Sequence, residues 1–287
     1  PAKRSLSSSA SQAKHHPGFG PLSSNVRFHN MPREQLYESA LANMQRTVYV
    51  LAARVPPPHE VPYKTSFMFR YVEQLPQQAL VQKLARVVTT LHAATVLMQH
   101  GFVQEQGALQ RVVHEIHEDI TFLAYGLIFN DLTPLHKQYL DAFYEEEFDT
   151  DDPIDSTQKR PMVRRSKIQA YIANKEGSDL DPSRAIALSK TLTKTYSGFV
   201  HAASPQIMDM YGGNPPHFHV EGMLGTRRHA EYRMDLWNYY YRSILAFGMV
   251  AKAFGDQELF DQIQDFTVKF EEAANKSYSP KREIPGK

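Results

Sequence analysis

Residues 105–129, EQGALQRVVHEIHEDITFLAYGLIF, are the stretch from which the fold can be read. Apolar side chains return every three or four residues, which is the spacing of one face of an α-helix. These side chains are Leu109, Val112, Val113, Ile116, Ile120, Leu123 and Leu127. The polar Arg111, His114, Glu115 and Glu118 fall on another side, which we expect to be the more hydrated one. A long helix with such an apolar face predicts neighbouring helices that cover it.

The same helical spacing recurs on both sides of this stretch. Upstream, patterns begin at Pro32 and at Pro76, where a first helical turn tolerates proline. Further helices are expected at 134–148, 167–176 and 182–202, after Thr226 and after Asp256. No run of period two predicts a strand. The sequence therefore predicts an all-α fold, a multi-helix bundle of six or seven main helices with irregular loops.

Composition divides the chain into five segments. Residues 1–30 are rich in serine and basic residues, which predicts a flexible N-terminal tail, and 279–287 form a basic tail. An acidic run from Glu145 to Asp155 is followed at once by basic residues, so we interpret 149–166 as a charged linker. The linker separates an N-terminal helical half, 31–148, from a C-terminal helical half, 167–278, that is expected to pack on the first.

Overall composition excludes several classes of protein. The 32 basic and 31 acidic residues give a net charge of +1, which provides no global field for nucleic acid or for a membrane surface. The absence of cysteine excludes disulfides, thiolate metal sites and cysteine nucleophiles. No run approaches the roughly 18 to 20 apolar residues that span a bilayer. We expect a cytoplasmic protein without a membrane partner.

Residues 196–233, YSGFVHAASPQIMDMYGGNPPHFHVEGMLGTRRHAEYR, contain features that a plain helical bundle does not require. Four histidines, three arginines, five glycines and three prolines lie between two strongly helical segments. Arg227, Arg228 and His229 stand at a predicted helix start, where free amides and the helix dipole attract anions. This pattern predicts an anion-binding site for phosphate or an acidic partner. The alternative is internal pairing of the arginines with the acidic run of residues 145–155, or plain solvation.

Two groups of residues could ligate a metal. His114, His117 and Glu118 lie three and four residues apart, so they share one helical face. His217 and His219 can point to one side if their backbone is extended, with a third ligand from elsewhere. Neither group has the spacing of a zinc protease or of a di-iron bundle, and ordinary surface pairing is the alternative. The identity of any cofactor is left open.

One resemblance rests on two features. Arg111 and Glu115 lie on one long helix, and TYSGFVHA, residues 195–202, ends another. This combination is similar to uncharacterised bacterial all-helical domains related to the HEPN superfamily. The resemblance implies a metal-independent ribonuclease of a toxin or phage-defence system, with an arginine four to six residues before a histidine. The pairs that satisfy this spacing are Arg54 with His59, Arg86 with His92 and Arg111 with His117.

Three functions follow as hypotheses. The first is a bacterial interaction or scaffold protein with a polar anion- or partner-binding site near 196–233, whose partner could be a second copy, another protein or RNA. The second is the HEPN-like ribonuclease, in which His117 or His201 would be the general base and Arg111 or Arg228 would stabilise phosphate. The third is a metal-dependent enzyme that uses the histidine and glutamate ligands. Whether the protein is an enzyme is left open.

Overall fold

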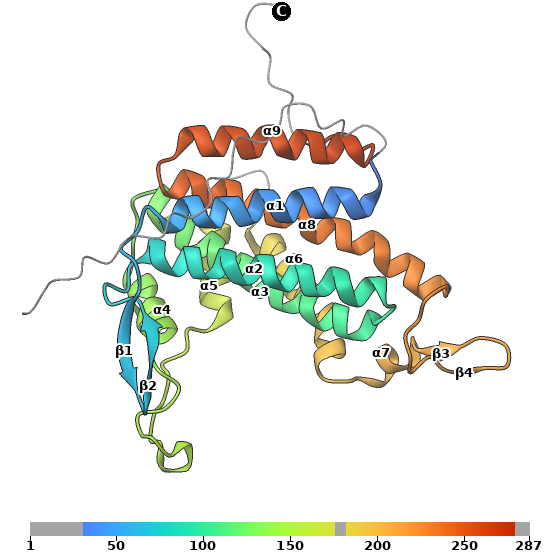
Figure 1. Cartoon of the computed structure of the whole chain (residues 1–287), viewed down its shortest axis with the longest axis horizontal. Coiled ribbons are helices and arrows are strands. Elements are labelled where there is room, and N and C mark those ends of the chain that lie inside the picture. Colours follow the sequence, from blue (N-terminus) through green and yellow to red (C-terminus); the bar gives the residue numbers. More distant parts are fainter. Residues whose placement is uncertain (1–30, 176–181, 279–287) are drawn as a thin grey trace, which may run out of the picture.

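The computed structural model describes residues 31–175 and 182–278 (Figure 1). Both predicted tails lie outside these residues. The helices are α1 (Arg33–Ala52), α2 (Pro76–Gln99), α3 (Val103–Ile128), α4 (Pro134–Tyr144), α5 (Arg165–Lys175), α6 (Pro182–Val200), α7 (Ser204–Met208), α8 (Arg227–Ala253) and α9 (Gln257–Ala273). Six of these described helices have 17 to 27 residues, so the predicted all-α bundle is confirmed. No helix of the described residues combines the length and apolar character needed to cross a membrane.

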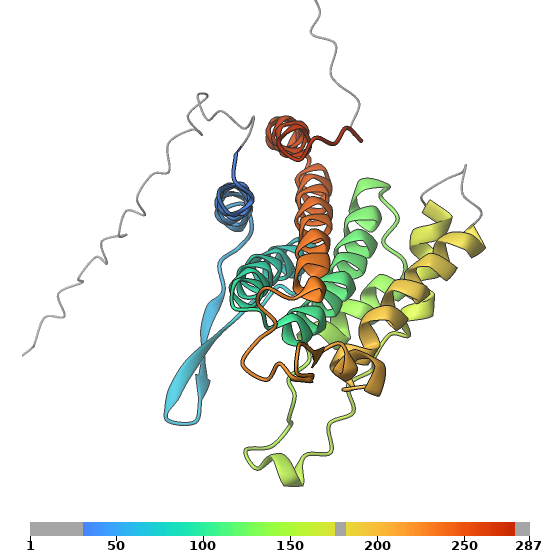
Figure 2. The same cartoon turned by 90° about the vertical axis from the view of Figure 1, so that its right-hand side faces the viewer.

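Helix α3 lies at the centre of the bundle and packs against α2, α4, α5, α6 and α8 (Figure 2). Of the four residues expected on a hydrated side of this helix, Arg111 and Glu115 are partly exposed, but the expectation was wrong for His114 and Glu118. His114 is 2% exposed and Glu118 is 8% exposed, because α8 and α5 cover the side on which they lie. A helix with neighbours on so many sides buries polar and apolar side chains alike.

A single cluster of buried apolar side chains joins the two predicted halves. It includes residues from α1, α2, α3, α5, α6, α8 and α9, and Tyr240, Phe122, Phe247 and Phe270 are among its largest members. Trp237 and Tyr239 of α8 are also buried. In the predicted linker, Arg160 pairs with Glu147 at 2.8 Å. The acidic and basic runs thus contact each other.

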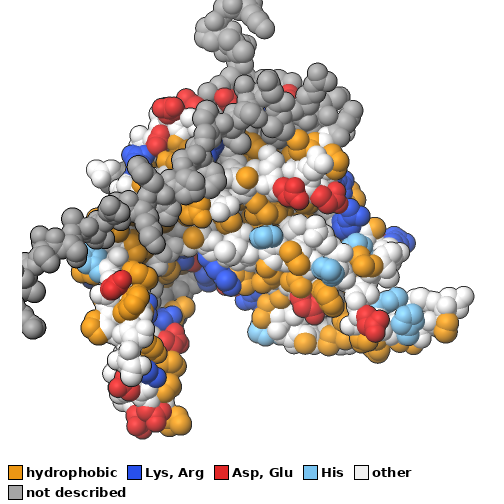
Figure 3. Space-filling view, viewed as in Figure 1, with side chains coloured by type: hydrophobic (Ala, Val, Ile, Leu, Met, Phe, Trp, Pro, Cys, Tyr) orange, Lys and Arg blue, Asp and Glu red, His pale blue; other side chains and the backbone are white. Residues whose placement is uncertain are grey.

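The prediction that the chain contains no strands was wrong. Strands β1 (His59–Tyr63) and β2 (Ser66–Arg70) form an antiparallel hairpin that projects from the bundle, with Lys64 at a positive φ of 51° in its turn (Figure 1). Most positions of both strands are exposed, and Figure 3 shows apolar side chains gathered on this projection. Because neither face of the hairpin is buried, its sequence lacks the alternation by which half-buried strands are recognised.

Candidate functional site

The predicted anion-binding residues at the start of α8 are engaged within the protein. Thr226 caps the helix as expected, because its Oγ1 accepts a hydrogen bond from the His229 amide at 3.1 Å. Arg227 pairs with Glu231 at 2.8 Å, and Arg228 pairs with Asp209 and with Glu231, both at 3.0 Å. Both arginines are therefore paired within the protein, but with Asp209 and Glu231 rather than with the acidic run of residues 145–155 that the sequence suggested.

His229 itself turns inward. Its ring is buried, and Nε2 lies 2.8 Å from the carbonyl oxygen of Met98 at the end of α2. A carbonyl oxygen only accepts hydrogen bonds, so Nε2 carries the proton and donates it. His229 thus joins α8 to α2.

The remaining histidines of the 196–233 segment lie at the surface. His201 follows the end of α6 and is exposed. Strands β3 (Tyr211–Gly212) and β4 (His217–Phe218) form a small projection (Figure 1). His217 lies in β4 and His219 follows it, with ring centroids 4.5 Å apart. His217 Nδ1 lies 2.9 Å from the Pro215 carbonyl oxygen. In the described parts of the chain, no three histidine, aspartate or glutamate side chains form a group that could hold a metal ion.

On α3, His117 is held by α8. Its Nε2 lies 2.9 Å from Ser243 Oγ, and that hydroxyl donates its own proton to the Tyr239 carbonyl oxygen at 2.7 Å. Ser243 must therefore accept from His117, so Nε2 carries the ring proton and Nδ1 is an acceptor. Burial, together with the nearby Arg242, keeps the pKa of His117 well below its ordinary value. The imidazole is neutral and enclosed.

The other predicted residues of α3 contact different neighbours. His114 Nδ1 accepts a hydrogen bond from Arg242 at 3.1 Å, while its Nε2 is 3.8 Å from Glu118. Glu118 in turn accepts from Gln169 of α5 at 3.0 Å. Arg111 pairs with Glu115 at 3.0 Å, as its spacing predicted. The three predicted metal ligands of α3 are thus directed towards α8 and α5 rather than towards one point.

A buried ion network next to these residues was not foreseen. Lys83 Nζ lies 2.8 Å from Asp119 Oδ2, and Arg165 of α5 donates to the other oxygen of the same carboxylate. Burial lowers the pKa of Lys83. Burial opposes ionisation of Asp119, but the two cations outweigh it and lower the pKa of that carboxyl. This network ties α2, α3 and α5 together.

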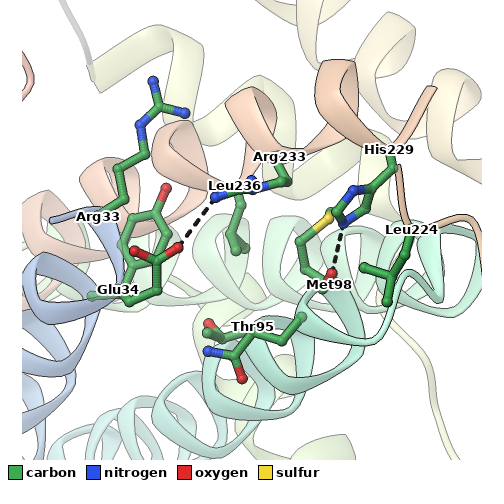
Figure 4. A pocket seen from close by; sticks show the side chains of 10 residues that line it. Arg33, Glu34, Thr95, Met98, Leu224, His229, Arg233 and Leu236 are labelled. Atoms are coloured by element: carbon green, nitrogen blue, oxygen red, sulfur yellow. Dashed lines mark hydrogen bonds and ion pairs between the residues drawn. The ribbon is translucent and has the colours of Figure 1, made fainter. Parts of the chain in front are cut away.

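A pocket of about 220 Å³ opens between α1, α2 and α8 (Figure 4). Its wall includes His229 and Arg233, so it lies beside the 196–233 segment. Arg233 and Glu34 point towards each other across it at 3.1 Å (Figure 4). The remaining lining residues are Arg33, Tyr37, Thr95, Met98, Gln99, Leu224 and Leu236.

The pocket contains a polar group without a partner. The Tyr37 ring stacks on Tyr240 with centroids 4.3 Å apart, and its hydroxyl is buried without a hydrogen bond to any described residue. Burial raises the pKa of this hydroxyl to about 12, while the nearby Arg33 acts in the opposite direction. Arg33 is exposed and forms no ion pair within the described ranges. The site therefore offers one free guanidinium and one unsatisfied hydroxyl.

Comparisons of the chain with protein-family models, curated proteins and solved structures found no match. The pocket residues on α1 and α2 were missed by sequence reasoning. One signal could have identified Arg33, because an arginine in the first turn of a helix opposes the helix dipole. The same argument applies to Arg227 and Arg228 at the start of α8. Tyr37 and Met98 carried no such signal, since they have the spacing of ordinary core residues.

Proposed function

We propose that the protein is a helical-bundle binding protein whose pocket between α1, α2 and α8 holds the anionic group of a ligand. The observation that carries this proposal is the buried hydroxyl of Tyr37, which bonds to no described residue and lies within the electrostatic influence of Arg33, Glu34 and Arg233. A buried donor without a partner costs about 1–3 kcal/mol, so an acceptor in the pocket would remove a real penalty. An oxyanion is the acceptor that also suits the two guanidinium groups.

The pocket also indicates the chemical character of the ligand. Arg233 and Glu34 form an exposed pair, which contributes little, so Arg233 can turn towards a bound anion at low cost. Met98, Leu224 and Leu236 provide apolar surface in the same pocket. A carboxylate or phosphate monoester with a short apolar part matches both kinds of surface.

The alternatives are less well supported by the geometry. The ribonuclease hypothesis needs His117 or His201 as base and Arg111 or Arg228 on the phosphate. His117 is 5% exposed, and both arginines are paired with carboxylates. RNA binding draws on several unpaired cations along a surface, whereas this pocket has two, one of them paired with Glu34. A carboxylate from another protein or from a second copy has the chemistry of the proposed ligand, and would make the protein a scaffold.

Isothermal titration calorimetry with hexanoate and with inorganic phosphate tests the proposal. We expect wild-type protein to bind at least one probe, and Arg33→Gln and Arg233→Gln each to weaken it about tenfold, because a charge-assisted hydrogen bond contributes about 1.5–3 kcal/mol. Arg227→Gln is the matched control, an exposed arginine of α8 that also pairs with a glutamate. Binding that is unchanged in Arg33→Gln, or absent from wild type, would contradict a free-ligand site.

Two further measurements separate the sources of the anion. Tyr37→Phe keeps the ring stack but removes the unpaired hydroxyl, so it should weaken binding while leaving the unliganded protein as stable or more stable. Sedimentation velocity of wild type and Arg33→Gln tests for another chain. A dimer that dissociates in the variant would assign the anion to a carboxylate of a second copy.

A further inference from the structure

The β3–β4 projection carries two histidines whose imidazole rings lie side by side. His217 is opposite Gly212 in the antiparallel pair, and the His219 amide continues the pairing by donating to the Met210 carbonyl oxygen at 2.9 Å. Side chains two residues apart on an extended strand point to the same face. The two ring centroids are accordingly 4.5 Å apart, so His217 and His219 form a pair on one face of the projection.

Two neighbouring glycines leave space beside these rings. A Cβ added to Gly212 would lie 3.9 Å from His219 Nε2, and a Cβ added to Gly213 would lie 3.0 Å from His217 Cε1, the ring atom that is bonded to Nε2. The edges of both rings therefore reach over the same short turn. Because His217 is exposed and His219 is partly exposed, an ion from solvent can reach these edges.

Hydrogen bonding leaves one ring nitrogen of His217 free to bind a metal. Its Nδ1 lies 2.9 Å from the Pro215 carbonyl oxygen, which only accepts, so Nδ1 carries the ring proton and Nε2 keeps its lone pair. A histidine that ligates a metal commonly donates its other N–H to a carbonyl in this way, which fixes the tautomer and the orientation of the ring. The His219 ring makes no hydrogen bond to a described residue.

The separation of the two rings favours one type of metal geometry. A histidine nitrogen binds a metal at about 2.0 Å, which puts the ring centroid about 3.2 Å from the ion. Two such rings at a right angle have centroids about 4.5 Å apart, whereas a tetrahedral angle requires about 5.2 Å. The observed 4.5 Å is the value for neighbouring ligands of a tetragonal ion, and this geometry with nitrogen ligands is typical of copper(II) and nickel(II).

We propose that His217 and His219 bind one copper(II) ion through their Nε2 atoms, as neighbouring ligands of a tetragonal site. Imidazole suits this ion, and copper(II) binds such sites more tightly than the other divalent metals of its row. No third histidine, aspartate or glutamate of the described chain joins the pair, which leaves the other positions for water. The site uses no residue of the pocket between α1, α2 and α8, so this inference does not rest on the anion site.

Titration of the full chain with copper(II), followed by electron paramagnetic resonance, tests the assignment. We expect the first equivalent to give a tetragonal spectrum with hyperfine structure from two imidazole nitrogens. His217→Gln and His219→Gln should each weaken binding at least tenfold, because loss of a mere outer-shell partner already costs about 10- to 100-fold. Both variants should unfold in urea as wild type does, since the projection lies outside the core. A first equivalent that binds equally well to both variants would overturn the proposal.

Histidines elsewhere in the chain provide matched controls. His201→Gln removes another exposed histidine, and the double variant His15→Gln with His16→Gln removes two adjacent histidines of the N-terminal sequence. Both controls should bind the first equivalent of copper(II) as wild type does. Loss of that equivalent in either control would overturn the proposal, because the ion would then be bound elsewhere.

Gly212→Val tests the arrangement of the rings while it keeps both ligands. Gly212 has no positive φ, so its backbone accepts a strand-forming valine. The added side chain would fill the space beside His219 Nε2, and copper affinity should fall towards that of His219→Gln. Unchanged affinity in Gly212→Val would overturn the inference that the two rings converge on one ion.

Discussion

Helix α3 and the 196–233 segment both carry histidines and arginines, but their surroundings differ. His114 and His117 lie on a helix that is packed against five others, so each ring nitrogen faces another protein group or a buried space. His201 and His217 are exposed to solvent. The comparison of these histidines shows that burial determines which polar side chains are held in one position. The number of histidines in a stretch does not.

The 196–233 segment has one part that behaves like α3. Met223 is buried, its amide bonds to Gly101, and His229 bonds to Met98. These contacts fasten the start of α8 to the turn between α2 and α3. Residues 222–229 therefore hold the start of α8 against the turn between α2 and α3, and we call them the clamp. The preceding part of the segment projects from the surface, and stability measurements can separate the two parts.

Removing the carboxylate of the buried network should have the largest effect. Asp119→Ala leaves Lys83 buried without its counter-ion, and breaking such a pair costs about 3–5 kcal/mol. The free energy of unfolding from urea denaturation measures this loss. Asp141→Ala, which breaks an exposed pair with Lys137, is the control and should cost under about 1 kcal/mol. Equal losses would show that burial on α3 has no special weight.

The clamp should be the next most sensitive element. Gly222 has φ +109°, and an added Cβ would lie 2.4 Å from the His100 carbonyl oxygen, so Gly222→Ala should cost about 3 kcal/mol. Gly225 has φ +77° with open space around it, so Gly225→Ala should cost only about 1 kcal/mol. Thermal unfolding of both variants checks the difference. A milder effect at Gly222 would mean that the segment is not held against α2.

Lowering the pH should destabilise the folded protein, because His117 is buried in its neutral form. Its pKa in the folded protein lies below its ordinary value, so below about pH 6.5 the unfolded chain binds a proton that the folded protein does not. Stability therefore falls with falling pH, by up to about 1.4 kcal/mol per pH unit for this one group. His117→Gln should remove the contribution of this residue to the pH dependence of stability. His136 should continue to contribute, because burial lowers its pKa as well. Urea denaturation between pH 5 and pH 7 measures how steeply the free energy of unfolding changes with pH. An unchanged slope in His117→Gln would show that His117 binds its proton equally well in the folded and the unfolded protein.

The smallest effect on stability is expected from an exposed ion pair in the first turns of α8. Arg227 has a side chain that is 92% exposed and pairs with Glu231 four residues later, so a double-mutant cycle of Arg227→Gln with Glu231→Gln should give a coupling of about 0.3–0.5 kcal/mol. Calorimetric or urea unfolding of the four proteins yields this value. A coupling well above 1 kcal/mol would show that the pair has a structural role that its exposure does not suggest.

Local patterns accounted for the fold and for several details. The spacing of apolar residues predicted the long helices, and the caps Thr226 and Asp256 are confirmed by hydrogen bonds from the amides of His229 and Leu259. The hairpin of β1 and β2 was missed because both of its faces are exposed. Its pairing depends on a turn at Lys64 and Thr65 rather than on a buried face.

The candidate sites could be predicted only in part. The importance of α3 and of the stretch near Arg233 was recognised from their composition. The residues that complete the pocket, such as Tyr37 on α1, have helical spacing and no distinctive motif. Their relevance comes from what lies opposite them, which is a property of helix packing.

The sequence by itself determined that this chain forms long amphipathic helices, because helical spacing and capping act over a few neighbouring residues. Only the tertiary structure decided that α3 is covered on the side where His114 and Glu118 lie and that Arg227 and Arg228 are paired. It also decided that the Tyr37 hydroxyl is buried where no described residue bonds to it. These outcomes depend on contacts between residues far apart in the chain, where burial makes each unpaired polar group costly and so gives it a possible role in binding.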